Sequence, residues 1–154
     1  MKRSNNRLHL MLIPLLMLSS CSMSKMMFLE DESKYEFNKT VEELKSILEK
    51  NGWDVTRKTD MQEHYAQYGF ETRDMVTFEI CKPEGAVAIL NEDDFTRMLP
   101  FMPMRVAVYK KTDGKIYISG IRLKMMKKCS SGVVKDVMKV GAVDLELAIG
   151  ELIL

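Results

Sequence analysis

The hydrophobic pattern divides the chain into a leading apolar run and a longer region in which short strands alternate with helices. Residues 34–39 alternate aromatic and polar side chains, and this period predicts a first strand. The apolar positions that follow recur at helical spacing. A Thr40-x-x-Glu43 capping box predicts where this helix begins, and Asn51-Gly52 predicts where it ends. Its apolar face consists of Val41, Leu44, Ile47 and Leu48.

The middle of the chain carries shorter patterns bounded by glycine and proline. Gly69 would end one short helix, and Pro83 bounds a strand that is rich in β-branched and aromatic residues. The predicted elements are a second strand over 53–59, a short helix over 61–70, a third strand over 74–81, a short helix over 84–90 and a connecting segment over 92–100.

The last third of the chain predicts a hairpin and a closing helix. Thr112-Asp113-Gly114 is a turn sequence between strand-like runs at 104–111 and 115–120. Val106 and Val108 alternate with Ala107 and Tyr109, which indicates a sheet with one buried face. A helix is predicted over 133–154, with an inner side of Val134, Val137, Met138, Val140 or Gly141, Leu145, Ala148 and Ile149.

The order β-α-β-(α)-β-α-β-β-α predicts an α+β fold, with helices packed on one face of a mainly antiparallel sheet. The 154 residues are 46% hydrophobic and 29% charged, which is typical of one globular domain, here over 34–154. No internal repeat or low-complexity tract interrupts it.

The first 20 residues predict an export signal. Basic residues precede an apolar run over 8–18, which is too short to span a bilayer as a helix. Leu18-Ser19-Ser20-Cys21 then resembles the bacterial lipoprotein box, which predicts cleavage before Cys21 and acylation of that cysteine, with palmitate among its acyl chains. Residues 21–33 would form a lipidated tether. The expected location is the cell envelope, facing the periplasm. Ser22 resembles the pattern of lipoproteins that are sent to the outer membrane.

Charge argues against a nucleic-acid partner. The formal net charge is +1, and removal of residues 1–20 leaves 20 basic against 22 acidic side chains. Binding to phosphates relies on clustered lysine and arginine, which the sequence offers only in the run 124–128. This run is interpreted first as a solvated helix face and second as a patch facing anionic lipid.

Catalytic and cofactor motifs are absent from the sequence. It contains no glycine-rich phosphate loop, no H-E-x-x-H and no paired C-x-x-C, so no cofactor is expected. His64 is the one histidine after the export signal, and a structural or surface role is the simpler interpretation. An enzyme that pairs Cys81 or Cys129 with His64 remains an alternative.

The cysteines leave three alternatives open. Cys81 and Cys129 could form a disulfide outside the cytoplasm, or they could stay as packed free thiols. Cys81 could instead join the methionines near Pro100 and Pro103 as a soft ligand for copper(I). Methionine as a flexible core filler is the simpler interpretation.

A pocket is predicted where strand ends meet proline-bounded loops. Such a pocket would suit an apolar ligand that bears an acidic group, with Lys82 and Arg105 at its mouth. The candidate lining residues are His64, Cys81, Lys82, Pro83, Phe101, Met102, Pro103, Met104 and Arg105.

Four stretches of the sequence resemble a known family, the domain of unknown function 302. They are FNKTVEELKSILEKNGWDV, the segment with Asp60 and His64 that leads to Gly69, EICKP, and LPFMPMRVAVYKKTDGKIYISG. The resemblance covers nearly the whole chain after the export signal. It implies a compact α+β fold that is able to pair into homodimers, and it implies no established activity.

Together these features favour a non-enzymatic, lipid-anchored module that binds a small apolar or soft ligand, or an envelope protein. A thiol-based redox protein or enzyme using Cys81 is the alternative, and a soft-metal carrier is the third hypothesis.

Overall fold

The computed structural model describes residues 25–128 and 130–154, without the side chains of residues 126–128. Cys21 and Cys129 therefore lie outside the described residues. The elements in chain order are β1 (Phe28–Glu32), α3 (Phe37–Lys50), β2 (Asp54–Asp60), α4 (Met61–Ala66), β3 (Met75–Cys81), α5 (Pro83–Leu90), the 3₁₀ helix η1 (Asp93–Phe101), β4 (Met104–Lys110), β5 (Ile116–Ile121), α6 (Leu123–Lys128) and α7 (Gly132–Gly150).

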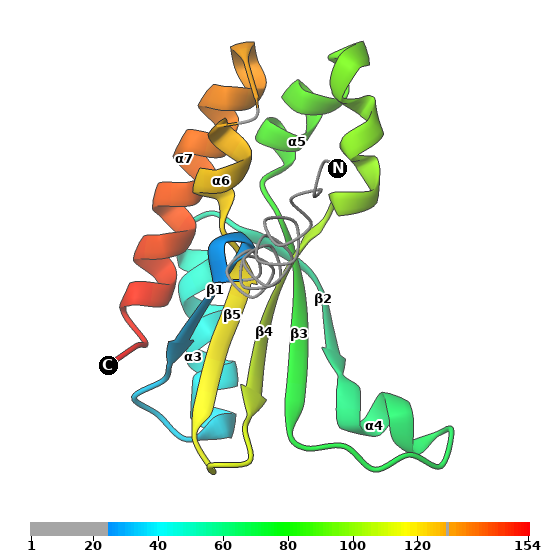
Figure 1. The fold of residues 1–154 in the computed structure, drawn as a ribbon, viewed down its shortest axis with the longest axis vertical. Helices are drawn as coiled ribbons and strands as arrows, with labels where there is room; N and C mark the ends of the chain where they lie inside the picture. The colour runs from blue at the N-terminus through cyan, green and yellow to red at the C-terminus, as the bar shows by residue number, and fades with distance from the viewer. Residues whose placement is uncertain (1–24, 129) are drawn as a thin grey trace, which may run out of the picture.

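A five-stranded sheet with the order β1-β5-β4-β3-β2 forms the centre of the molecule, and every neighbouring pair is antiparallel (Figure 1). Helices α3 and α7 cover one face of this sheet, so the predicted α+β fold is confirmed. The predicted alternation in the hairpin is also confirmed, because Val106 and Val108 are completely buried while Ala107 and Tyr109 are not. Other buried side chains on this face are Val76, Phe78, Ile80, Ile116 and Ile118.

Helix α3 begins earlier than its capping box predicts. The Glu36 carboxylate accepts hydrogen bonds from the backbone N–H groups of Asn38 and Lys39, at 3.0 and 2.7 Å, and so caps the helix. Thr40 lies inside the first turn, where its hydroxyl donates to the Glu36 carbonyl at 2.8 Å. The predicted apolar face is buried, and Gly52, with a positive φ of 76°, ends the helix as predicted.

The first strand is β1, and the strand predicted over 34–39 is wrong. Phe28 pairs with Ile121 and Glu32 with Tyr117, so residues that the sequence pattern assigned to the tether form an edge strand instead. This pairing joins segments about 90 positions apart, so the hydrophobic pattern within either segment does not predict it. The Lys34 N–H donates to the carbonyl of Leu152, which attaches the turn after β1 to the C-terminus.

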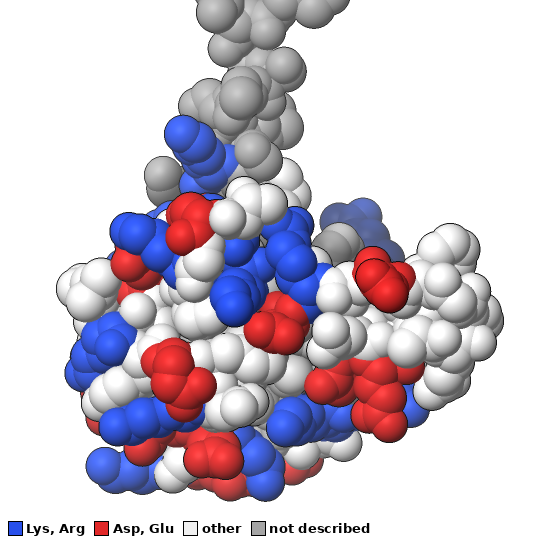
Figure 2. All heavy atoms as spheres, turned by 90° about the horizontal axis from the view of Figure 1, so that it is seen from below, with Lys and Arg blue, Asp and Glu red and all other residues white. Residues whose placement is uncertain are grey.

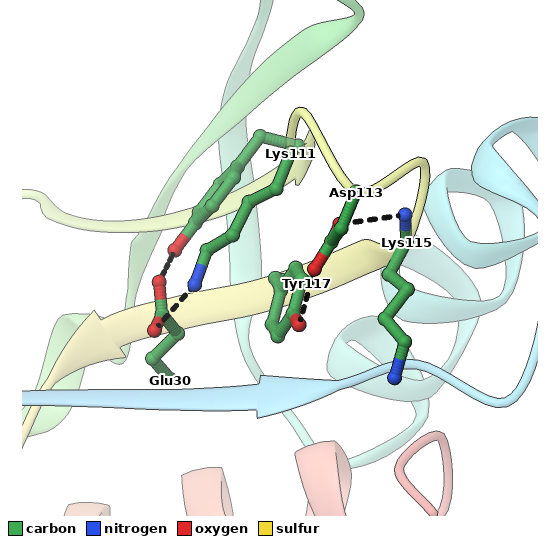
Figure 3. A network of polar contacts seen from close by, with 6 residues as sticks. Glu30, Lys111, Asp113, Lys115 and Tyr117 are labelled. Carbon is green, nitrogen blue, oxygen red and sulfur yellow. Dashed lines mark hydrogen bonds and ion pairs between the residues drawn. The ribbon is translucent and has the colours of Figure 1, made fainter.

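A polar network on the open face attaches β1 to the β4–β5 hairpin (Figure 3). The Glu30 carboxylate accepts from the Lys111 ammonium at 2.8 Å and from the Tyr109 hydroxyl. The hydrogen bond from Lys111 lowers the pKa of Glu30, and burial raises the pKa of Tyr109 to about 12. Asp113 in the turn accepts from the Lys115 N–H and the Tyr117 hydroxyl, at 2.9 and 3.2 Å. These contacts hold the hairpin turn and the edge strand together.

Two helical segments differ from the prediction. Residues expected to form a plain connection make η1, and α6 adds a helix to the predicted order. On the closing helix α7, Gly141 is buried and Val140 is exposed, so the inner side runs through the glycine. None of the helices in the described ranges is long and apolar enough to cross a membrane.

A buried pair of hydroxyl groups joins the turn after β1 to α3 and yields a stability prediction. The Oγ atoms of Ser33 and Thr40 lie 2.7 Å apart, and Thr40 is completely buried. We expect Thr40→Val to lower the free energy of unfolding by about 1–3 kcal/mol, because it leaves the Ser33 hydroxyl short of a partner. Urea unfolding measures this loss. The exposed Ser46→Ala change on the same helix is the control, and an equal loss in both variants would contradict the prediction.

Candidate functional site

A cavity of about 420 Å³ lies at one end of the sheet, where β3 ends, β4 begins and β5 ends. Antiparallel pairing brings these ends together, because Ile80 on β3 lies opposite Met104 on β4. Ile121, the last residue of β5, also lines the cavity. In Figure 1 this end of the sheet carries α5 and η1 on one side and α6 and α7 on the other. The volume lies within the range of roughly 300–1,000 Å³ that small-molecule sites occupy.

Small residues set how closely the helices approach one another around this cavity. A Cβ added at Gly85 on α5 would lie only 2.9 Å from a methyl group of Val137 on α7. A Cβ added at Gly141 on α7 would lie 3.4 Å from Leu123 and 3.7 Å from the Trp53 ring. The two helices therefore meet at Gly85, while α7 lies close to the indole at Gly141.

The cavity wall is mainly apolar. Trp53, the only tryptophan of the chain, precedes β2 and is 4% exposed. Its buried indole N–H has no hydrogen-bond acceptor among the residues that the structure describes. The sulfur-containing lining residues are Cys81, Met98, Met102, Met104 and Met138.

The positive charge of the cavity wall is already paired. Lys82 forms an ion pair with Asp144 of α7, and its ammonium lies 5.2 Å from the centroid of the Trp53 ring. Glu84 and Asp136 also line the cavity and add negative charge. Lys82 is thus already paired, which leaves this part of the site better suited to an uncharged group than to an anion.

Cys81 does not have the properties of a reactive thiol. Burial raises its pKa, and the negative charge of Asp54 raises it further. Asp54 lies opposite Cys81 in the pairing of β2 with β3. Nucleophilic cysteines depend on the opposite environment, one that favours the thiolate.

The structure brings together six of the nine pocket residues expected from the sequence and separates two. His64 lies on α4, at the other end of the sheet, where its ring contacts Tyr65 and Tyr68. Successive strand residues point to opposite faces, so Arg105 points away from the face that carries Val106. On that other face it forms an ion pair with Glu79 at 2.8 Å. Pro83 begins α5 beside the cavity. The six that line it are Cys81, Lys82, Phe101, Met102, Pro103 and Met104.

Several lining residues were missed by sequence reasoning. Trp53 was assigned only to a strand, although a single tryptophan directly after a helix stop is a notable feature. Met138 was expected on the inner side of the last helix, and nothing local linked it to Met98 on η1. These residues come from three distant parts of the chain, and only the packing of α7 against the sheet end brings them together.

The opposite end of the molecule carries a hollow of about 580 Å³ whose lining is mainly polar and includes Asp60, Asp74 and Lys110. Figure 2 views this end, and lysine and arginine side chains intermingle there with aspartate and glutamate. Ion pairs such as Lys110 with Asp74 and Lys115 with Glu32 account for part of this mixture. The face in this view therefore has no extended patch of one sign. Within residues 25–128 and 130–154, no group of three or more His, Cys, Asp or Glu side chains is placed to hold a metal.

The family model for the domain of unknown function DUF302 matches residues 29–149, and the chain therefore belongs to this family. It is similar to the crystal structure of an uncharacterized conserved DUF302 protein from Bacillus stearothermophilus, with 21% sequence identity and a TM-score of 0.71. The match covers 82% of this chain and 98% of that one, and at this identity it shows the fold alone. No curated protein matches the chain.

The chemistry of Cys81 yields a second prediction. We expect alkylation of Cys81 at neutral pH to be severalfold slower in the folded protein than in the urea-unfolded chain, because its raised pKa lowers the thiolate fraction. Peptide mass spectrometry measures Cys81 separately from Cys129. Asp54→Asn should accelerate the folded-state reaction, since it removes one of the two causes of the shift. A folded-state reaction faster than the unfolded one would contradict this account and favour a redox role.

Proposed function

We propose that this protein is a lipid-anchored lipoprotein of the bacterial cell envelope, and that its domain binds a small apolar ligand in the cavity at the end of the sheet. The observation that carries the proposal is the cavity itself, which is apolar, rich in sulfur and lined by Trp53. Pockets with these properties are the usual sites of small-molecule binding. The ligand would fill the space between the apolar walls.

The lipid anchor is supported by the sequence before the domain. The basic start, the short apolar run and the Leu18-Ser19-Ser20-Cys21 box together resemble a lipoprotein signal. Acylation at Cys21 by two or three chains would give stable attachment, which a single chain would not. The domain would then face the periplasm, with the outer membrane favoured by Ser22.

The position of the anchor supports the position of the site. Met27 and Phe28 lie at the same end of the sheet as the cavity, because Phe28 pairs with Ile121. The six residue steps from Cys21 to Met27 reach at most about 20 Å. The cavity would therefore work close to the membrane surface that holds the anchor.

The other two hypotheses have less support. A redox enzyme would use Cys81 as a thiolate, and a soft metal would also bind the thiolate form, yet the environment of Cys81 raises its pKa. His64, the proposed base for such an enzyme, lies at the far end of the sheet. The sulfur set is better explained as adaptable packing for an apolar ligand. Pairing into dimers, which the family resemblance implies, stays a prediction.

Filling the cavity tests the proposed binding. Trp53 lines the cavity and is the only tryptophan, so its fluorescence reports on the site alone. We expect a monoacylglycerol with a brominated acyl chain to quench this fluorescence in a saturable way. Ala86→Phe should weaken the binding about tenfold or more, because the new ring would occupy the space of the ligand.

Val87→Phe is the matched control, since Val87 is the next residue of α5, is exposed and does not line the cavity. It should bind as the unaltered protein does. Circular dichroism checks that both variants are folded. Equal binding by Ala86→Phe, or no saturable quenching of the unaltered protein, would contradict the proposed site.

The anchor has its own test. We expect the chain produced in a bacterial host to carry the mass of its acyl chains and to sediment with membranes. Cys21→Ser should abolish the added mass, because only a thiol forms the thioether to diacylglycerol. Cys81→Ser, as the control, should keep it. Intact mass spectrometry decides the matter, and an unchanged mass in the Cys21→Ser protein would contradict lipidation.

A further inference from the structure

A second apolar hollow of about 340 Å³ adjoins the cavity and is here called the arginine hollow. The two share the lining residues Met98, Ile121 and Met138, so they lie side by side, and together they are here called the trough. Among the side chains that the structure describes, the charged residues that line the arginine hollow are Arg97 on η1 and Arg122, which directly follows β5. The remaining lining residues are Met27, Phe95, Met125, Ser130 and Val134.

The two guanidinium groups are available to a ligand. Neither forms an ion pair with a carboxylate in the described part of the chain, and the residues outside that part include no aspartate or glutamate. The backbone of Arg122 is fixed by a hydrogen bond, which its N–H donates to the carbonyl of Met27 at 2.8 Å. Its side chain also donates to the carbonyl of Phe28, at 3.3 Å. One fixed and one exposed arginine therefore face a hollow that is lined by no acidic residue.

The charges divide the trough into two chemically different parts. The deep cavity has an apolar wall and a paired lysine, with Glu84 and Asp136 also present, so an anion is disfavoured there. The arginine hollow combines an apolar wall with two positive charges. Guanidinium groups match the geometry of carboxylate and phosphate groups and form charge-assisted hydrogen bonds with them. The trough is thus complementary to a molecule with an apolar tail and an anionic head.

We infer that the ligand is an anionic amphiphile with one acyl chain, whose chain lies in the cavity beside Trp53 and whose phosphate or carboxylate head binds Arg97 and Arg122. This inference rests on the proposed function and adds the class of ligand. It also assigns the acidic head to a different pair of cations from Lys82 and Arg105, which are already paired with Asp144 and Glu79.

The membrane is the source of such a molecule. Met27 contributes to the wall of the arginine hollow and is six positions after the proposed acylated cysteine. Exposed apolar side chains lie on the elements around the trough, among them Leu99 at 53% and Phe101 at 56% exposed. The arginine end of the trough is therefore the end nearer to the lipid anchor. A membrane amphiphile would enter there with its acyl chain first, so that its head group stays at the arginines.

The test compares two probes that differ only in charge. The full chain is held in neutral phosphatidylcholine nanodiscs, and Trp53 quenching is measured with a brominated lysophosphatidic acid and with the monoacylglycerol that has the same chain. The Ala86→Phe protein sets the background from probe dissolved in lipid. We expect the phosphate-bearing probe to bind about tenfold or more tightly than the uncharged one. The Arg97→Gln/Arg122→Gln double variant should lose this preference while still binding the uncharged probe.

An Arg57→Gln/Arg73→Gln double variant is the matched control, because it removes the same charge from exposed residues that do not line the trough. It should keep the tenfold preference. Equal affinity for the two probes in the unaltered protein would overturn the inference and leave the apolar site standing. Absence of quenching by either probe would overturn the proposed function itself.

Three further outcomes would also overturn the inference. The first is a preference that survives in the Arg97→Gln/Arg122→Gln protein. The second is a loss of binding to anionic phosphatidylglycerol vesicles in that variant without any change in the preference between probes, which would assign the arginines to the membrane surface. Binding of both probes only after Cys21→Ser would show instead that the protein's own acyl chains occupy the trough.

Discussion

Burial of one face of the sheet under α3 and α7 is the interaction on which the rest of the structure depends. The side chains of Phe78, Val106 and Ile118 are completely buried there, and each fully buried side chain of this size contributes about 1.5–3 kcal/mol. Because α7 is longer than the strands that it covers, part of it extends past the sheet end. There it meets α5 at Gly85 rather than another layer of strands. The cavity is the space that this geometry leaves between the helices and the ends of β3, β4 and β5.

The sequence predicted those elements whose signal is local. The face of α3, the β4–β5 turn and the inner side of α7 each follow from a period or a turn residue within about 20 positions. The strand β1 was missed because its pairing with β5 is an interaction between distant segments. The sequence predicted Thr40 as the cap of α3, but Glu36 caps this helix. The Thr40 hydroxyl lies instead in the buried contact with Ser33. Where two local signals compete, the tertiary contact decides.

In the candidate site, too, the sequence predicted the contacts with a local signal and missed those between distant segments. Cys81–Pro83 and 101–104 were expected to meet because both flank strand ends, and antiparallel pairing places those ends together. The prediction that Arg105 lines the pocket was wrong. Successive side chains of a strand point to opposite faces of the sheet, so Arg105 lies on the other face from its neighbour Met104. Trp53, Arg97 and Arg122 could not be found in this way. They lie in three separate parts of the chain, and only the packing around the sheet end brings them to one trough.

Uncovered apolar surface at this end also argues for a function. Leaving apolar wall in contact with water forfeits about 25 cal/mol for each Å² that could have been buried. A larger side chain at Ala86 would fill part of the space, yet a small residue stands there. A sequence shaped by stability alone would close such a cavity. Its retention next to two arginines without a carboxylate partner is explained most simply by an occupant with a polar head and an apolar chain.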